Sequence, residues 1–177
     1  MKDEVKIVGY VPGAIGKIIE QHAVYFSKRF GFDYTFEAEV ADYLVNFMRH
    51  FQNDRDGLWV AISRNTVIGS VVIDGRNQQS EGIRLRLFLV DPNYHGQGIG
   101  RRLLQEAIEF CKSNGYDKII LWTFDGLAAA RHLYLQFGFQ LKEEREVDYW
   151  GCKLIEQKYE LLLSTHDIVV QKNPLSL

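Results

Sequence analysis

Apolar residues recur at helical spacing in four segments of the chain. A repeat of about 3.6 residues is typical of a helix that buries one face. In the second segment the shared face is formed by Val40, Leu44, Phe47, Met48 and Phe51. Gly115 and Gly138 follow the last two segments, where glycine commonly ends a helix. The predicted helices are residues 15–30, about 37–51, 98–114 and 127–137.

Short alternating or continuously apolar runs separate these helices and predict strands. Residues 58–65 and 66–75 form a predicted hairpin, with its turn near Asn65 and Thr66. The run 118–124, KIILWTF, is apolar nearly throughout, as expected of a buried central strand. The other predicted strands are residues 5–10, a strand from about 82 that ends at Val90 before Asp91 and Pro92, and two strands within 139–163 joined by a charged loop.

The order of these elements is β-α-α-β-β-β-α-β-α-β-β, which predicts a mixed α/β sheet with helices on both faces. Residues 1–177 are expected to form one domain, because no linker or repeat divides them. Its core is expected over about residues 5–163, with a tail from 164 to 177. Within that tail, residues 168–170 are a candidate for one more edge strand.

Composition narrows the class of protein. The chain has 177 residues, 46% of them hydrophobic, and a formal net charge of −2. That charge gives no general attraction for nucleic acid, and no apolar run is long enough to cross a membrane. Cys111 and Cys152 lack metal-site spacing and are expected to be buried or spare thiols, with no metal bound. The charged N-terminus resembles a first strand rather than a signal peptide, so a cytoplasmic protein is expected.

The stretch VDPNYHGQGIGRRLL, residues 90–104, places three glycines between a strand and a helix. Backbone N–H groups from Gln97 to Arg101 would be unpaired helix-start donors, which suit a pyrophosphate. A tight β-to-α turn that needs glycine only for its dihedral angles explains the spacing equally well. The spacing is not that of a dinucleotide fingerprint, and no P-loop lysine follows.

The longer stretch FLVDPNYHGQGIGRRLL resembles the acetyl-CoA-binding motif of the GNAT superfamily of N-acetyltransferases, and ARHLYLQFGFQL resembles that family's second conserved block. The stretches FGFDYTFEAEVADYL, LWTFDGLAAARHLY and WGCKLIEQKYEL are similar to the GNAT domains fused behind MarR-type regulators. No DNA-binding half precedes them here, so the enzyme domain is expected to stand alone. The resemblance implies the GNAT acyl-CoA N-acyltransferase fold, with a central, mostly antiparallel twisted sheet, and acetyl-CoA as co-substrate.

The resemblance also assigns cofactor-binding roles. It implies that the main chain of Phe88, Leu89 and Val90 pairs with pantetheine amides. It implies that the pyrophosphate is held by Gly96, Gln97, Gly98, Ile99, Gly100 and Arg101. Leu127 stands where many members carry an asparagine that binds pantetheine, so that contact is in doubt. His95 stands where glutamine or arginine is usual and is expected to face solvent rather than to act as a catalyst.

Tyr134 is the catalytic candidate, since the equivalent tyrosine in the family protonates the departing thiolate; a core aromatic is the alternative. The general base is open. Arg84 stands where some members carry a glutamate, which leaves Glu37 or ordered water. For Glu37, recognition of a cationic amine ranks first, stabilisation of a helix start second and a base third.

On the acceptor side, Arg86 and Gln157 match the regulator-fused subgroup; Arg86 is a candidate to bind an acceptor carboxylate, with a surface strand position as the alternative. An aromatic cluster could line the pocket or belong to the core: Phe32, Tyr34, Phe36, Tyr149 and Trp150. The expected reaction is transfer of acetyl to a primary amine of a small molecule or peptide. A non-catalytic acyl-CoA-binding regulatory module and a nucleotide-binding protein are the rivals, and a homodimer is left open.

Overall fold

A computed structural model describes residues 4–79 and 81–163 and contains one seven-stranded sheet in the order β1-β2-β3-β4-β5-β7-β6. Neighbouring strands are antiparallel except β4 and β5, which are parallel, so the predicted mixed and mostly antiparallel sheet is confirmed. The strands are β1 (Lys6–Val8), β2 (Gly57–Ser63), β3 (Thr66–Asp74), β4 (Ile83–Val90), β5 (Lys118–Phe124), β6 (Gln140–Tyr149) and β7 (Cys152–Leu162). The candidate strand at residues 168–170 lies outside the described residues.

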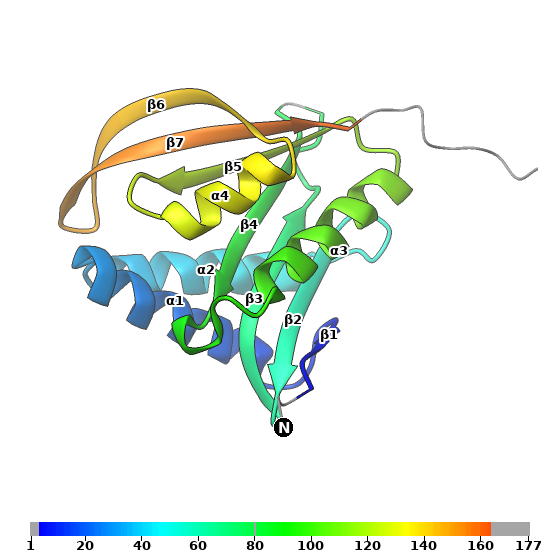
Figure 1. The fold of residues 1–177 in the computed structure, drawn as a ribbon, viewed down its shortest axis with the longest axis horizontal. Helices are drawn as coiled ribbons and strands as arrows, with labels where there is room; N and C mark the ends of the chain where they lie inside the picture. The colour runs from blue at the N-terminus through cyan, green and yellow to red at the C-terminus, as the bar shows by residue number, and fades with distance from the viewer. Residues whose placement is uncertain (1–3, 80, 164–177) are drawn as a thin grey trace, which may run out of the picture.

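Four helices cover the two faces of the sheet: α1 (Ala14–Phe30), α2 (Tyr34–Arg49), α3 (Ile99–Ser113) and α4 (Ala128–Gln136). Helices α1 and α2 lie on one face of the sheet and α3 and α4 on the other (Figure 1). Buried side chains of α1 and α2 pack with those of β2 and β3, and buried side chains of α3 and α4 belong to the core on the opposite face. The prediction of helices on both faces is therefore confirmed. No helix in the described ranges is long and apolar enough to cross a membrane.

Helix α2 begins three residues before its predicted start at residue 37. The Asp33 carboxylate accepts a hydrogen bond from the Thr35 N–H over 2.9 Å and caps the helix at that point. The helix then ends at Arg49 rather than at residue 51. Because of this cap, Glu37 lies within the first turn of α2, where a carboxylate stabilises the positive end of the helix dipole.

The two strands predicted within 139–163 are β6 and β7, and the charged residues lie mostly in β6 rather than in the loop that joins the strands. The β6 sequence QLKEEREVDY is exposed along nearly its whole length, because β6 is an edge strand with a single partner, β7. The reversal is confined to Trp150 and Gly151, whose φ values of 51° and 80° form a tight turn. Part of the charge is paired across the hairpin, as in the 2.7 Å contact between Arg145 and Glu156.

Strand β4 pairs with β5 at only two positions, Ile83 with Ile119 and Arg84 with Ile120. Beyond Arg84 the two strands diverge (Figure 1). Leu87 has a φ of 48°, and the register between β3 and β4 shifts opposite this part of the strand. The outer half of β4 is therefore a bulged strand whose edge toward β5 is open.

The two cysteines are both free thiols, as predicted. Cys111 lies on the buried face of α3, where burial raises the pKa of its thiol to about 12. The Cys152 thiol is half-buried and donates to the Phe30 carbonyl oxygen over 3.0 Å. Cys111 therefore keeps its proton at neutral pH and is not an activated nucleophile.

Candidate active site

A large cleft of about 1250 Å³ opens where β4 and β5 separate. Its walls come from α1, α2, β4, the loop before α3, β5, α4 and the β6–β7 hairpin. Seven arginine and lysine side chains line it, against three glutamates: Arg29, Arg84, Arg86, Arg101, Arg145, Lys118 and Lys158, with Glu39, Glu81 and Glu156. Positive charge therefore gathers in this cleft although the chain as a whole is slightly acidic.

The glycine-rich loop presents a row of unpaired backbone donors to the cleft. Gly96 and Gly98 have φ values of 73° and 75°, a conformation that residues with a side chain rarely adopt. The first donor of the α3 ladder is the Arg102 N–H, which bonds the Gly98 carbonyl oxygen over 3.1 Å. Within the described part of the chain, the N–H groups of residues 96–101 have no acceptor. The loop is thus built to accept an anion.

Gly100 has a different role from the two glycines before it. A Cβ at this position would lie 3.1 Å from Leu133 Cδ1 and 3.4 Å from Phe88 Cζ. Its lack of a side chain lets the first turn of α3 approach both β4 and α4. Of the residues expected in the loop site, all but Gln97 line the cleft. The side chain of Arg101 bonds Gln136 and lies 5.6 Å from the centre of the Phe137 ring.

His95 connects the loop to the end of β4. Its ring is exposed, yet Nε2 lies 2.8 Å from the Val90 carbonyl oxygen. A carbonyl has no proton to give, so Nε2 carries the hydrogen and donates. His95 therefore has a positioning role: it fixes the turn from which the unpaired N–H groups project. Leu127, at the start of α4, lines the cleft with an apolar side chain.

Tyr134 lies on α4 at the floor of the cleft, 4% exposed. Its ring packs against Phe88 of β4, with centroids 5.8 Å apart, and against Phe139 and Tyr159. Its hydroxyl has no hydrogen-bond partner among the described residues. Burial, and secondarily Tyr159, raise the pKa of Tyr134, so the hydroxyl keeps its proton and can donate it toward the cleft.

Phe88, Leu89 and Val90 all line the cleft on the open edge of β4, where β5 supplies no partner. Their other edge pairs with β3 through Leu89 and Val90. The Val90 carbonyl accepts the His95 bond described above, and it retains a second lone pair. An extended amide-containing ligand would find main-chain groups on this edge in the way that an added strand does.

The structure does not bring Glu37 to the cleft. It is exposed on α2, whereas Glu39 lines the cleft and accepts a 2.8 Å hydrogen bond from Trp150 Nε1. The reason is the helix phase: Phe36, Val40 and Phe47 face the core, and Glu39 and Glu37 flank that face on opposite sides. Helix-start stabilisation, the second of the three roles weighed for Glu37, is the one that its position supports.

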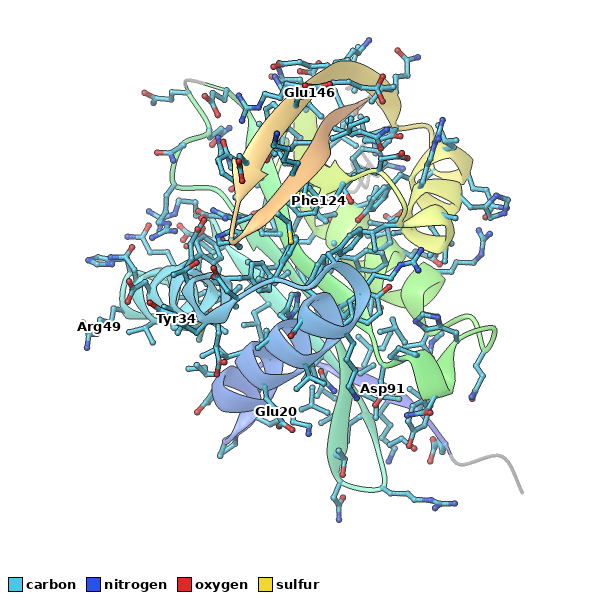
Figure 2. The ribbon with its side chains drawn as sticks, turned by 90° about the vertical axis from the view of Figure 1, so that its left-hand side faces the viewer. Glu20, Tyr34, Arg49, Asp91, Phe124 and Glu146 are labelled. Atoms are coloured by element: carbon cyan, nitrogen blue, oxygen red, sulfur yellow. The ribbon has the colours of Figure 1, made fainter. Side chains whose placement is uncertain are left out.

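The other acceptor-side candidates separate into two groups. Arg86, Phe36, Tyr149 and Trp150 line the cleft. Phe32 is core, stacked on Phe26 and tilted against Trp150, and Tyr34 is 82% exposed at the start of α2 (Figure 2). Gln157 does not reach the cleft, because its amide donates to Glu144 Oε1 over 2.7 Å and joins β7 to β6.

Sequence reasoning missed two cleft residues on the N-terminal helices, His22 of α1 and Tyr43 of α2. His22 is buried with Nδ1 2.8 Å from the Ile18 carbonyl oxygen, and burial lowers the pKa of its imidazole to about 4. The Tyr43 hydroxyl donates to Asp74 Oδ2 over 3.0 Å. A polar residue inside an otherwise apolar helical face was the available signal, and both positions carry it.

Comparison with known proteins identifies the family of this chain. The family model described as the acetyltransferase (GNAT) family matches residues 18–139, more than half of the chain. The chain belongs to the GNAT family of acetyltransferases. The match spans the glycine-rich loop, the diverging strands and Tyr134.

Two curated relatives and one solved structure illustrate the likeness. N-acetylaspartate synthetase of Xenopus tropicalis is 38% identical over 82 residues, which are 46% of this chain and 30% of that protein. N-acetyltransferase 8F1 of Rattus norvegicus is 30% identical over 123 residues, 66% of this chain and 56% of that protein. This GNAT chain thus spans about a third to just over half of these relatives.

The solved structure is a GNAT family acetyltransferase from Elizabethkingia anophelis with acetyl-CoA bound. It superposes with a TM-score of 0.63 at 17% sequence identity, over 92% of this chain and all of that one. At this identity the likeness shows the fold alone. The GNAT fold expected from the sequence is confirmed.

Proposed function

We propose that this GNAT protein is an acetyl-CoA-dependent N-acetyltransferase that works by direct transfer to a primary amine. One observation carries the proposal: a single cleft brings together the unpaired N–H groups of residues 96–101, the open edge of β4 and the partnerless hydroxyl of Tyr134. The N–H groups suit a pyrophosphate, and the open strand edge suits an amide-containing arm. The tyrosine hydroxyl suits a leaving group that needs a proton.

The residues fit acetyl-CoA along the length of the cleft. Backbone donors from Gly96 to Arg101 would hold the pyrophosphate, with no side chain at Gly96 or Gly98 to block its approach. The main chain of Phe88, Leu89 and Val90 would pair with the pantetheine amides on the edge that β5 leaves open. That same edge supplies N–H groups for negative charge that develops on an acyl oxygen. Acetyl-CoA supplies the activated acetyl thioester.

Tyr134 is proposed as the acid that protonates the departing thiolate. Its raised pKa makes complete transfer of the proton less favourable than it would be for an unperturbed phenol. The same shift guarantees that the hydroxyl is protonated when the thiolate departs. Tyr134 would therefore stabilise the developing negative charge first as a hydrogen-bond donor, with proton transfer completed as the bond to sulfur breaks.

On the acceptor side we propose Glu39, rather than Glu37, as the carboxylate that meets the amine. Glu39 lines the cleft and is oriented by Trp150 Nε1. It could attract a cationic amine or take its proton, directly or through water. The acceptor is proposed to be a small-molecule or peptide amine. The name of one relative, N-acetylaspartate synthetase, supports an amino acid among these.

The organisation of the chain is proposed with the same function. Residues 1–177 would form one domain with its core over about residues 5–163, and the protein is proposed to act in the cytoplasm. We also propose that the chain is related to the GNAT domains fused to MarR-type regulators, on the basis of the stretches FGFDYTFEAEVADYL, LWTFDGLAAARHLY and WGCKLIEQKYEL.

The test is to follow CoA release from acetyl-CoA by the purified chain over a panel of amines, with calorimetry of CoA and ATP binding alongside. We expect CoA to bind, ATP to bind far more weakly, and at least one amine to give turnover that Tyr134→Phe strongly reduces. CoA binding without turnover on any amine would favour a non-catalytic acyl-CoA-binding module. Tight ATP binding without CoA binding would overturn the assignment.

A further inference from the structure

Arg86 is a cation of the cleft that has no polar partner among the described residues. The other six lining arginines and lysines each bond a side chain or a carbonyl oxygen. These contacts are Arg84 with Glu81, Arg145 with Glu156, Lys118 and Lys158 with Glu160, Arg29 with the Gly126 carbonyl and Arg101 with Gln136. Within residues 4–79 and 81–163, Arg86 has neither a hydrogen bond nor an ion pair. Its donors are therefore free.

The guanidinium of Arg86 is nevertheless held in a defined place. It lies 3.8 Å from the centre of the Tyr43 ring, a close cation–π contact. The ring is fixed in turn by the bond from its hydroxyl to Asp74, which is itself paired with Arg76 over 2.7 Å. Burial raises the pKa of Tyr43, although the nearby Arg86 charge opposes the shift, so the hydroxyl stays a donor to Asp74.

Arg86 faces the acceptor side of the cleft. The bulge at Leu87 turns the residues on its two sides apart: Arg86 stacks on Tyr43 of α2, whereas Phe88 packs against Tyr134 of α4. The loop donors of residues 96–101 follow the far end of β4. Arg86 is thus separated from the pyrophosphate-binding end and opens toward α2 and Glu39, where an amine would enter.

We propose that the amine substrate carries a carboxylate and that Arg86 binds it, so the acceptor class is an amino acid or a closely related amino acid derivative. This inference rests on the proposed function. A half-buried guanidinium without a counter-charge is costly, and a carboxylate matches its planar fork with two parallel hydrogen bonds. With Glu39 on the same side, the cleft offers one negative and one positive group to a zwitterionic substrate.

The experiment compares matched amines with the full chain and acetyl-CoA. Free amino acids are paired with the amines that result from their decarboxylation, and kcat and KM are obtained from CoA release. We expect the best acceptor to carry a carboxylate that its neutral partner lacks. Arg86→Gln should lower kcat/KM for that acceptor by about 10- to 100-fold, mainly through KM, the effect of losing a charged hydrogen-bonded pair. The neutral partner should change less than about twofold.

Two further variants keep the result interpretable. Arg86→Lys retains the charge without the fork, so it should recover part of the loss. Arg49→Gln removes an exposed arginine outside the cleft and should leave both constants unchanged. Neutral amines that match their carboxylated partners, or an equal loss on both in Arg86→Gln, would overturn the inference while the acetyltransferase stands. Failure of the unmodified chain to bind acetyl-CoA would overturn the proposed function and the inference together.

Discussion

The Ser70 hydroxyl donates to the Leu87 carbonyl oxygen over 2.7 Å, at the point where β4 bulges away from β3. Leu87 has a φ of 48°, a left-handed conformation that costs a residue with a side chain about 1–2 kcal/mol. The bond from β3 offsets part of this cost and fixes the bulge. It thereby sets the directions of Arg86 and Phe88, which lead to the two sides of the cleft.

Ser70→Ala should lower the free energy of unfolding by about 1–3 kcal/mol, because a buried carbonyl loses its donor. It should also raise the KM for acetyl-CoA, since the bulge positions Phe88. The matched variant is Ser63→Ala on the neighbouring strand, where the buried hydroxyl has no partner. Removing that hydroxyl should be neutral or stabilising. Urea denaturation of both variants checks the pair, and equal losses would argue against a specific role for Ser70.

Tyr134→Phe should reduce kcat by about 10²–10⁴-fold, the range for one positioned acid, with the KM for acetyl-CoA nearly unchanged. Because burial raises the pKa of Tyr134, the hydroxyl is protonated throughout the neutral range. The remaining activity should therefore show the same pH dependence below pH 9 as the unmodified protein. Steady-state kinetics over a pH series provide the measurement.

The control for this variant is Tyr34→Phe, which removes a phenol hydroxyl from an exposed site at the start of α2. Its kinetics should match those of the unmodified chain. Both variants should keep their thermal midpoint, since neither hydroxyl has a partner among the described residues. Turnover unchanged by Tyr134→Phe would remove the acid from the mechanism.

Gly98→Ala and Gly115→Ala introduce the same backbone strain at two places, and they test whether the loop binds CoA. Both glycines have φ near 70–75° and open space where a Cβ would go, so each alanine should cost about 1–2 kcal/mol of stability. Gly98 is the N-cap of α3, beside the unpaired donors, whereas Gly115 follows the C-terminal end of the same helix. Calorimetry should show CoA affinity falling about tenfold for Gly98→Ala, equivalent to one charge-assisted hydrogen bond, and staying constant for Gly115→Ala. Equal affinities would remove the loop from the CoA site.

Stability should fall with acid through His22. Burial lowers the pKa of its imidazole from 6.5 to about 4, so between these values the unfolded chain binds more protons than the folded one. The unfolding free energy should therefore drop by about 3 kcal/mol from this group as the pH falls from 7 to 4.

His22→Phe keeps the ring stacked on Phe26 and should flatten this part of the profile. His50→Phe removes an exposed imidazole that makes the same 2.8 Å contact, with the Asn46 carbonyl oxygen, and should leave the slope unchanged. Denaturation at a series of pH values separates the two. Parallel profiles for His22→Phe and the unmodified chain would contradict the buried neutral imidazole.

The sequence was sufficient for the elements whose apolar pattern is strong. The strand at 118–124 has the predicted bounds, and the start of α1 and the ends of α4 lie within one residue of prediction, because their buried faces repeat regularly. It gave both strands of 139–163 but not the bounds of β6, because polar residues on both faces hide the alternation. An edge strand with both faces exposed needs no apolar pattern, so its pairing with β7 is visible only in three dimensions.

The sequence predicted the parts of the site in which a backbone conformation requires a particular residue type. It did not predict the parts that depend on the direction in which a side chain points. Gly96 and Gly98 mark the loop in the sequence, because both have the positive φ that favours glycine. Glu37 was expected on the acceptor side because it lies near the start of the second helix, but the phase set by Phe36, Val40 and Phe47 turns Glu39 rather than Glu37 toward the cleft. The bulge at Leu87 has no glycine to mark it, so the separation of Arg86 from Phe88 could not be foreseen.

The two edge strands of the sheet, β1 and β6, both disfavour pairing with a strand of another molecule. β1 has only three residues, too few to template a partner strand, and six of the ten residues of β6 are charged: Lys142, Glu143, Glu144, Arg145, Glu146 and Asp148. A second copy that paired with β6 in parallel and in the same register would place like charges opposite each other. The charge on β6 thus disfavours edge-to-edge aggregation of the sheet.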